Sequence, residues 1–198
     1  SYDGVVRGSN PFAVVLANQI LRQEGLRTAS QADLERALKT NALNLRGTYE
    51  DTGLVLRSSE EPNEYLAGNL AKQIKARGKK MKTPIMISLN GLELITDSDS
   101  PVGLAFKLTD DAELIYAPVL DEKNYQKSFS ETDENGLPSK LSVGNRTLYT
   151  RSSGLSRLCL GRDFGLDSNG GGLAFSNDGG RVVVVSPART QKTEGAKK

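Results

Sequence analysis

The sequence predicts a domain of the α+β class. Three helical patterns lie in its first 80 residues, and short apolar runs separated by turn residues fill most of the rest. The order helix, helix, strand, helix and then strands only favours helices that are segregated from a sheet over a regular βαβ winding. The 198 residues are 37% hydrophobic and 25% charged, so we expect a single domain over residues 1–198, with residues 188–198 as a flexible tail.

Two helices are predicted near the N-terminus. Asn10 followed by Pro11 is typical of an N-cap and a first helical residue, and apolar residues recur at steps of three and four over residues 12–21. Ser30 with Asp33 three residues later resembles a capping box, with Asp in place of the usual Glu. A second helix is therefore expected to begin directly after Ser30.

The middle of the chain alternates between helical and extended patterns. A short strand is expected at residues 52–56, and a third helix over residues 60–77, which Gly78 ends. Further on, two apolar runs at residues 104–108 and 112–116 have the length and composition of strands.

A hairpin and a central strand are predicted in the second half. Residues 84–89 and 92–95 flank Asn90-Gly91, a dipeptide typical of a tight turn between paired strands. Residues 121–140 are polar and read as an exposed loop. The run Val182–Val185 has no polar alternation, so we expect it at the centre of the sheet.

Composition excludes several classes of chemistry. The chain has no His, which rules out Ser-His-Asp and Cys-His nucleophiles and zinc sites that use imidazole. Its single Cys, Cys159, rules out an internal disulfide framework. A formal net charge of +2 is too small to favour nucleic acid as a partner.

Membrane insertion is not expected either. No apolar run approaches the about 20 residues that a helix needs to cross a bilayer. No signal peptide is visible at the start of the sequence, and a virion, a cell surface and the cytoplasm all remain open as locations.

Residues 141–190 contain no Lys, Glu, Gln, Met or Trp. The genetic code offers one reason for this absence. If the two adenines of an asparagine codon that ends in a pyrimidine are randomised, these same five amino acids cannot be reached. The segment therefore has the composition expected of randomised asparagine codons.

An apolar frame can be separated from a looser filling within this segment. We expect the frame to pack and to set the backbone, and the filling to face solvent and to bind a ligand. The frame is Leu155, Leu158, Leu160, Leu166, Leu173 and Ala174. The filling, which is the predicted binding set, is Ser152, Ser156, Arg157, Cys159, Gly161, Asp163, Phe164, Gly165, Asp167, Asn169, Gly170, Gly171, Gly172, Phe175, Asn177, Asp178 and Gly179.

The motifs Tyr149-Thr150-Arg151 and Ser153-Gly154-Leu155, the spaced leucines and the closing Gly180-Arg181 with its four valines carry a resemblance to a known family. The segment resembles the variable region of proteins diversified by diversity-generating retroelements, of the archaeal variable protein A type. The resemblance is specific over about residues 145–186 and loose over residues 1–140.

This resemblance implies a fold and a mode of function. It implies a C-type lectin-like fold with N-terminal helices and a C-terminal, mostly antiparallel sheet, in which a reverse transcriptase diversifies about residues 152–180. The diversified side chains would form a ligand-binding surface. The chain lacks the disulfides of calcium-dependent lectins, so no metal or other cofactor is expected.

Three short motifs in the segment match known sites in letters only. Asp163-Phe164-Gly165 lacks the other kinase motifs, and Asp167-Ser168-Asn169-Gly170 lacks the spacing and terminal Glu of an EF-hand. Gly170-Gly171-Gly172 is not followed by a helical pattern that could cradle a phosphate. None of them is expected to bind a metal or a nucleotide.

The sequence thus predicts a non-enzymatic recognition protein, a monomer or small oligomer, with a protein as its ligand. Phe164 and Phe175 would be apolar anchors, and Arg157 and the aspartates would give polar specificity. Two alternatives stay open. One is an assembly module of a virion or surface appendage. The other is a carboxylate-based enzyme that would use Asp110, Asp111, Glu113, Asp121 and Glu122.

Overall fold

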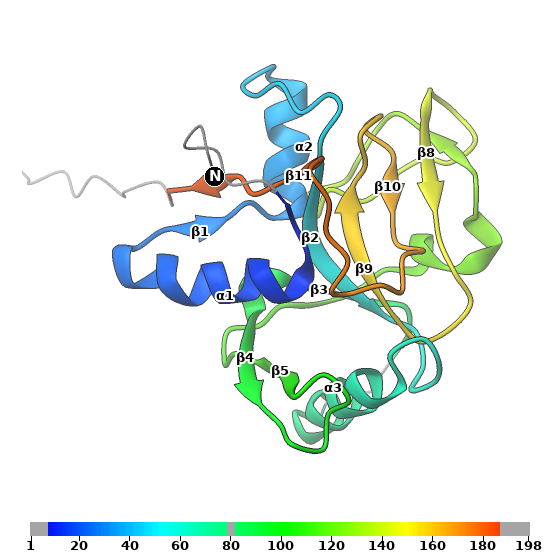
Figure 1. Cartoon of the computed structure of the whole chain (residues 1–198). Coiled ribbons are helices and arrows are strands. Elements are labelled where there is room, and N and C mark those ends of the chain that lie inside the picture. Colours follow the sequence, from blue (N-terminus) through cyan, green and yellow to red (C-terminus); the bar gives the residue numbers. More distant parts are fainter. Residues whose placement is uncertain (1–7, 79–81, 187–198) are drawn as a thin grey trace, which may run out of the picture.

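The computed structural model describes residues 8–78 and 82–186, and it confirms the α+β class. Helices lie around a curled sheet of short strands (Figure 1). The described α-helices are α1 (Pro11–Leu21), α2 (Gln31–Lys39) and α3 (Glu64–Ala76). The described strands are β1 (Arg27–Thr28), β2 (Tyr49–Leu56), β3 (Ile85–Ser88), β4 (Leu92–Thr96), β5 (Leu104–Leu108), β6 (Leu114–Tyr116), β7 (Ser128–Phe129), β8 (Arg146–Tyr149), β9 (Leu155–Leu160), β10 (Leu166–Asp167), β11 (Gly180–Arg181) and β12 (Val184–Val185). The expected tail at residues 188–198 lies outside the described residues.

The predicted starts of α1 and α2 are confirmed. The side-chain oxygen of Asn10 accepts a hydrogen bond from the Ala13 amide at 2.9 Å, and Pro11 is the first helical residue. At α2, the Ser30 hydroxyl accepts from the Asp33 amide, and the Asp33 carboxylate accepts from the Ser30 amide at 2.9 Å. Each cap satisfies amides that the first helical turn leaves unpaired.

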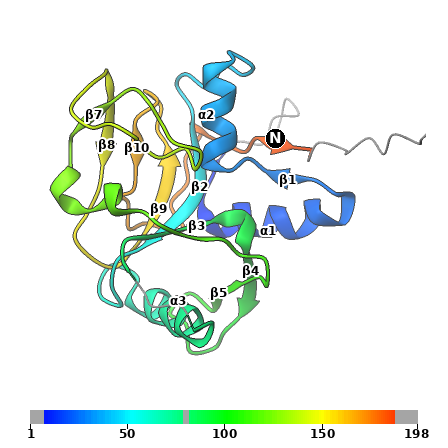
Figure 2. The same ribbon diagram turned by 180° about the vertical axis from the view of Figure 1, so that it is seen from behind.

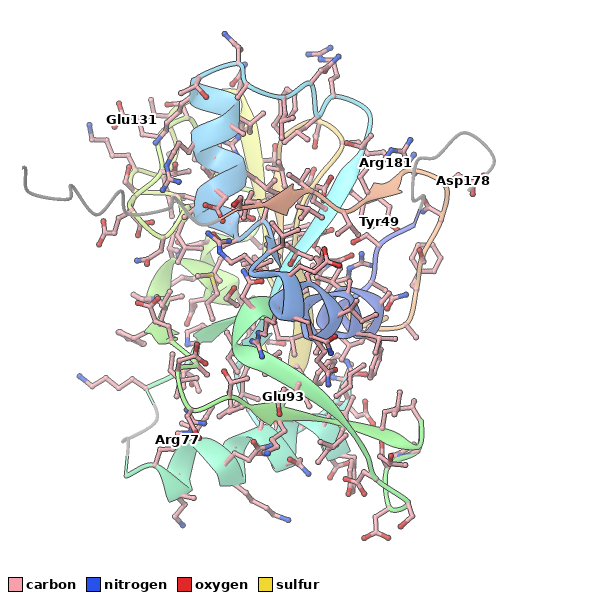
Figure 3. All side chains as sticks on the ribbon, turned by 90° about the vertical axis from the view of Figure 1, so that its left-hand side faces the viewer. Tyr49, Arg77, Glu93, Glu131, Asp178 and Arg181 are labelled. Atoms are coloured by element: carbon pink, nitrogen blue, oxygen red, sulfur yellow. The ribbon has the colours of Figure 1, made fainter. Side chains whose placement is uncertain are left out.

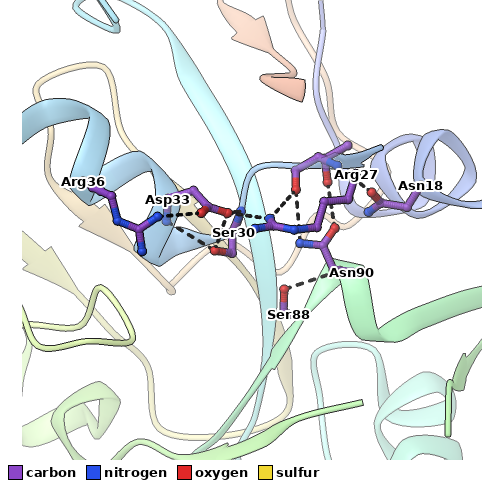
Figure 4. A network of polar contacts seen from close by, with 8 residues as sticks. Asn18, Arg27, Ser30, Asp33, Arg36, Ser88 and Asn90 are labelled. Atoms are coloured by element: carbon purple, nitrogen blue, oxygen red, sulfur yellow. Dashed lines mark hydrogen bonds and ion pairs between the residues drawn. The ribbon is translucent and has the colours of Figure 1, made fainter. Parts of the chain in front are cut away.

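Asp33 also connects the start of α2 to Arg27 of β1 (Figure 4). Its carboxylate accepts hydrogen bonds from the guanidinium groups of Arg27 and Arg36 as well as from Ser30. Burial alone would raise the pKa of Asp33, but the hydrogen bonds from Arg27 and Ser30 outweigh it and lower the pKa to about 2. The capping carboxylate is therefore charged at neutral pH.

Helix α3 begins at Glu64, four residues later than expected from the apolar pattern. Pro62 explains part of this difference, since a residue that precedes proline is disfavoured in the α conformation. Asn63 adopts a left-handed conformation at φ 64° directly before the helix. The segment before Glu64 is thus held out of the helix by its backbone.

The main sheet has β2 near its centre. Among the described residues the strand order is β6-β3-β2-β9-β10-β8-β7, and β11 also pairs with β2. The β10–β8 and β11–β2 pairs are parallel and the other pairs of this sheet are antiparallel. All eight residues of β2 are buried.

The prediction that Val182–Val185 is the central strand is wrong. Only Val184 and Val185 are in a strand, which pairs with β1 in a separate two-stranded sheet, and the Val184 side chain is 48% exposed. An apolar run without alternation is consistent with a buried strand, but its periodicity alone does not establish one. The central strand β2 begins with Tyr49-Glu50-Asp51-Thr52, whose polar residues hide it from an apolar pattern.

The predicted hairpin at Asn90-Gly91 is also wrong. Strand β3 pairs with β2 and β6, whereas β4 pairs with β5 in another sheet. Asn90 and Gly91 lie in a short 3-10 turn between the two sheets. A Cβ atom on Gly91 would lie 3.1 Å from Ala112, so this glycine serves a close chain contact.

The apolar core lies on both faces of the main sheet. Leu54 and Leu56 of β2 belong to a cluster with α1, α3, β4 and β5, while Val55 belongs to a cluster on the other face. The segment 121–140, expected as an exposed loop, covers that second face, where it buries Phe129 and Leu137 (green in Figure 2). The expectation of full exposure was wrong because two apolar residues among many polar ones are enough to anchor a loop.

Candidate functional site

The expected leucine frame is confirmed. Its five leucines are between 0% and 3% exposed, and they lie on β9, on β10 and in the segment after β10; they are Leu155, Leu158, Leu160, Leu166 and Leu173. Ala174, which was assigned to the frame, is exposed. It lies in the same turn as Leu173, whose side chain takes the core position of this stretch.

A pocket of about 500 Å³ lies over β9 and β10. Ten of its lining residues belong to the predicted binding set: Arg157, Cys159, Gly161, Asp163, Gly165, Asp167, Gly170, Gly172, Phe175 and Asn177. Tyr49, Tyr149 and Arg162 complete the lining. In Figure 1 the segment after β10, in orange, crosses the face of the sheet toward β11, and it forms one side of this pocket.

The turn between β9 and β10 shapes one end of the pocket. The Gly161 amide donates to the Gly165 carbonyl at 2.7 Å, and the Asp163 carboxylate accepts from the Gly165 amide at 3.1 Å. Phe164 occupies the left-handed region at φ 66°. A Cβ atom on Gly165 would lie 2.9 Å from the Thr147 carbonyl oxygen, so a larger residue there would have to move the backbone.

A buried ion pair forms the floor of the pocket. The Arg157 guanidinium donates two hydrogen bonds to the Asp51 carboxylate, at 2.6 and 2.5 Å. The Asp51 side chain is fully buried and that of Arg157 is 8% exposed. Burial lowers the pKa of Arg157, but the charge and hydrogen bonds of Asp51 more than offset this, and the net shift is upward. The expectation that Arg157 faces solvent was wrong because a buried carboxylate on β2 requires a partner.

Tyr49 joins this floor to the segment above it. The Arg157 guanidinium lies over the Tyr49 ring, 5.1 Å from its centre. The Tyr49 hydroxyl donates to the Ser9 carbonyl at 3.1 Å and accepts from the Asn177 amide at 3.0 Å. Residues from three distant parts of the chain therefore fix the pocket.

Three other members of the predicted set, Ser156, Cys159 and Gly165, are buried as well. Ser156 accepts a hydrogen bond from Arg57 at 2.9 Å and donates to the Ser168 carbonyl at 2.6 Å. Cys159 is 7% exposed, and burial raises the pKa of its thiol, which is therefore protonated at neutral pH. The expectation that Ser156 and Cys159 face solvent was wrong because both faces of β9 are covered, and all six of its residues are buried.

Seven members of the predicted set do not line this pocket. Phe164 is half-buried against the cluster that contains Leu34 and Leu160, and a Cβ atom on Gly171 would lie 2.8 Å from Pro62. Asp178 lies on an outer turn (Figure 3). The seven are Ser152, Ser156, Phe164, Asn169, Gly171, Asp178 and Gly179.

Sequence reasoning missed four residues of the site. Tyr49 and Asp51 lie about 100 residues before β9, in a stretch with no recognisable motif, and nothing in the sequence indicated them. Tyr149 was noted only as part of the family motif. Arg162 lies in the segment itself, and its position between Gly161 and Asp163, both predicted, could have identified it.

The acids considered for an enzyme do not converge. Asp111 and Glu113 line one hollow, whereas Glu122 lines another. A hydrogen bond from Thr109 lowers the pKa of Asp111, opposite to the shift that a general acid needs.

Among residues 8–78 and 82–186 no three acids or cysteines lie close enough to hold a metal ion. The part of the chain that the structure describes also has no helix with the length and apolarity to span a bilayer.

Comparison of the chain with models of known protein families, with curated proteins and with solved structures finds no match.

Proposed function

We propose that this chain is a ligand-recognition protein with a C-type lectin-like fold, whose residues from about 152 to 180 are diversified by a retroelement to present a variable surface to protein ligands. The observation that carries this proposal is the pocket, because ten members of the predicted binding set line one concave surface, and seven of the ten are exposed or partly exposed. Pockets of this size commonly hold a ligand group.

The separation of frame and surface supports this proposal. The leucines of β9 and β10 are buried, and β2 supplies further core from a distant part of the chain. Substitutions at exposed positions typically change the free energy of unfolding by no more than about 0.5 kcal/mol. Asp163, Phe175 and Asn177 are exposed pocket residues and could therefore vary without loss of the fold.

A protein ligand agrees with the chemistry of the rim. The Phe175 side chain is 60% exposed beside the pocket, although a large aromatic residue gains stability from burial. Aromatic residues are enriched at protein–protein interfaces, where they supply much of the binding free energy. Phe175 is thus the best candidate for a contact residue.

The first test is the DNA downstream of the gene. The proposal expects a near-copy of the last coding segment that differs only where the copy has adenine, next to a gene for a reverse transcriptase. If the downstream sequence from the source genome lacks both, diversification by a retroelement is excluded.

The second test compares two libraries displayed on yeast. One randomises four exposed pocket positions, Asp163, Gly172, Phe175 and Asn177, and the other randomises four buried positions, Ser156, Arg157, Cys159 and Gly165. We expect most members of the exposed library to be displayed in folded form and to yield binders to a panel of proteins. Members of the buried library should mostly fail to fold. Equal display of both libraries, or an exposed library without binders, would contradict the proposal.

A further inference from the structure

All three guanidinium nitrogens of Arg157, on the pocket floor, donate hydrogen bonds within the protein. Two guanidinium nitrogens of Arg157 donate to Asp51, and the third donates to the Phe175 carbonyl at 3.0 Å. Its charge is compensated by Asp51 at hydrogen-bond distance. Arg157 therefore offers a ligand little positive potential, and each of its three guanidinium nitrogens already donates a hydrogen bond within the protein.

The second arginine lies at the rim. Arg162 is exposed and donates to the Asn177 side-chain oxygen at 2.7 Å. The same oxygen accepts from the Gly179 amide at 2.9 Å, so Arg162 is held at the Asn177 end of the pocket.

The two carboxylates of the pocket, in contrast, each keep one oxygen without a hydrogen-bond partner among the described residues. Asp163 and Asp167 each use one carboxylate oxygen to accept a nearby amide, from Gly165 at 3.1 Å and from Asn169 at 2.7 Å. Their second oxygens have no hydrogen-bond partner, and neither carboxylate has an ion pair, within the described part of the chain. Once Arg157 is paired, two carboxylates face one arginine, and the pocket has an excess of negative charge.

Aromatic rings accompany these carboxylates. Tyr149 and Phe175 line the same pocket, and the face of an aromatic ring attracts a cation. The floor already contains such an arrangement, because Arg157 lies over the Tyr49 ring while its guanidinium is paired with Asp51. The pocket above it repeats the combination of ring and carboxylate, but neither Asp163 nor Asp167 is paired with a cation among the described residues.

We infer that the pocket binds a cationic side chain of the protein ligand, the guanidinium of an arginine or the ammonium of a lysine. This inference rests on the proposed function and names the chemistry that this particular version of the surface recognises. The carboxylates of Asp163 and Asp167 accept hydrogen bonds from the cation, and Tyr149 and Phe175 flank its apolar stem.

The test uses blocked tripeptides as probes. Acetyl-Gly-Arg-Gly-amide and the same peptide with neutral citrulline in place of Arg are titrated into the full chain, and the amide signals of Gly165 and Asn169 are followed by NMR. These amides donate to the two carboxylates and therefore report on them. We expect the arginine peptide to bind about tenfold more tightly than the citrulline peptide, and to weaken as salt rises.

Matched variants assign the effect to the pocket. Asp163→Asn with Asp167→Asn should reduce binding of the arginine peptide about tenfold and abolish its preference over citrulline. Asp178→Asn removes an equal kind of charge from the outer turn of the same segment and should leave binding unchanged (Figure 3). Equal binding of the two peptides, no binding of either, or an equal loss in Asp178→Asn would overturn the inference.

Further outcomes distinguish a protein side chain from a free small molecule as the source of the cation, and this inference from the proposed function. Spermidine carries the same ammonium chemistry as a free small molecule, and tighter binding of spermidine than of the peptides would point away from a protein side chain. A downstream template copy and a productive exposed library, combined with no preference for arginine, would refute this inference alone. Absence of both would refute the proposed function itself, whatever the peptides do.

Discussion

Replacing Arg157 with alanine is expected to lower the free energy of unfolding by about 3–5 kcal/mol, the usual cost of breaking a buried ion pair by removing one partner. The change leaves the fully buried Asp51 carboxylate without its two hydrogen bonds from the guanidinium. It also removes the link from β9 to the Phe175 carbonyl. Urea denaturation at pH 7, read as a shift of the midpoint at constant slope, measures the effect.

Arg162→Ala is the matched control, because Arg162 is five residues away and exposed. Its loss should cost no more than about 1 kcal/mol, as is usual for an exposed polar contact. Asp51→Ala combined with Arg157→Ala should cost less than the sum of the two single changes, since neither charge is then left unpaired. If Arg157→Ala were as mild as the control, Arg157 would be free for a ligand, contrary to the structure.

Replacing Glu50 with glutamine is expected to stabilise the protein at high pH. Glu50 is 3% exposed, one of its carboxylate oxygens accepts from the Val183 amide at 3.1 Å, and the other has no partner among the described residues. Burial, aided by the charge of Asp51 and opposed by the Val183 amide and Arg181, raises the pKa of Glu50 from 4.5 to about 7. A shift of this size corresponds to about 3 kcal/mol.

The sign of the pH dependence follows from the direction of the shift. Because the folded chain holds the Glu50 proton more tightly than the unfolded chain, this residue favours folding below about pH 4.5 and loses that contribution as the pH rises through about 7. Glu50→Gln cannot ionise, so its advantage over the wild type should grow from near zero at pH 4.5 to about 3 kcal/mol at pH 8.

Denaturation of both proteins at several pH values checks this expectation. Glu131→Gln is the control, because the Glu131 side chain is 64% exposed at the periphery (Figure 3) and should show no such pH-dependent gain. A constant difference between Glu50→Gln and the wild type across this range would show that Glu50 titrates normally in the folded protein.

Local features of the fold could be read from the sequence. The caps of α1 and α2 depend on residues within three positions of each other, Asn10 with Ala13 and Ser30 with Asp33. The range of β5 was predicted to the residue for the same reason, since a short apolar run bounded by turns is a local pattern. Strand partners could not be read, because pairing depends on which apolar surfaces remain uncovered after the helices have packed.

The candidate site also has a part that the sequence predicted and a part that it could not. Codon composition selected the segment whose residues line most of the pocket, and the leucine spacing identified the frame beneath it. Neither feature could show that Arg157 is committed to Asp51, which lies 106 positions earlier in the sequence. The assignment of Arg157 as a free contact residue failed for this reason.

By itself, the sequence determined the helix caps, the α+β class, the buried leucines and the chemistry that a chain without histidine cannot perform. Only the tertiary structure decided that Tyr49 and Asp51 lie under the pocket, that β2 is the central strand and that the valine run lies at an edge. The physical reason is the distance along the sequence over which each interaction acts. Caps and periodicity act between residues a few positions apart, whereas burial, charge compensation and the shape of a pocket depend on side chains that only folding brings into contact.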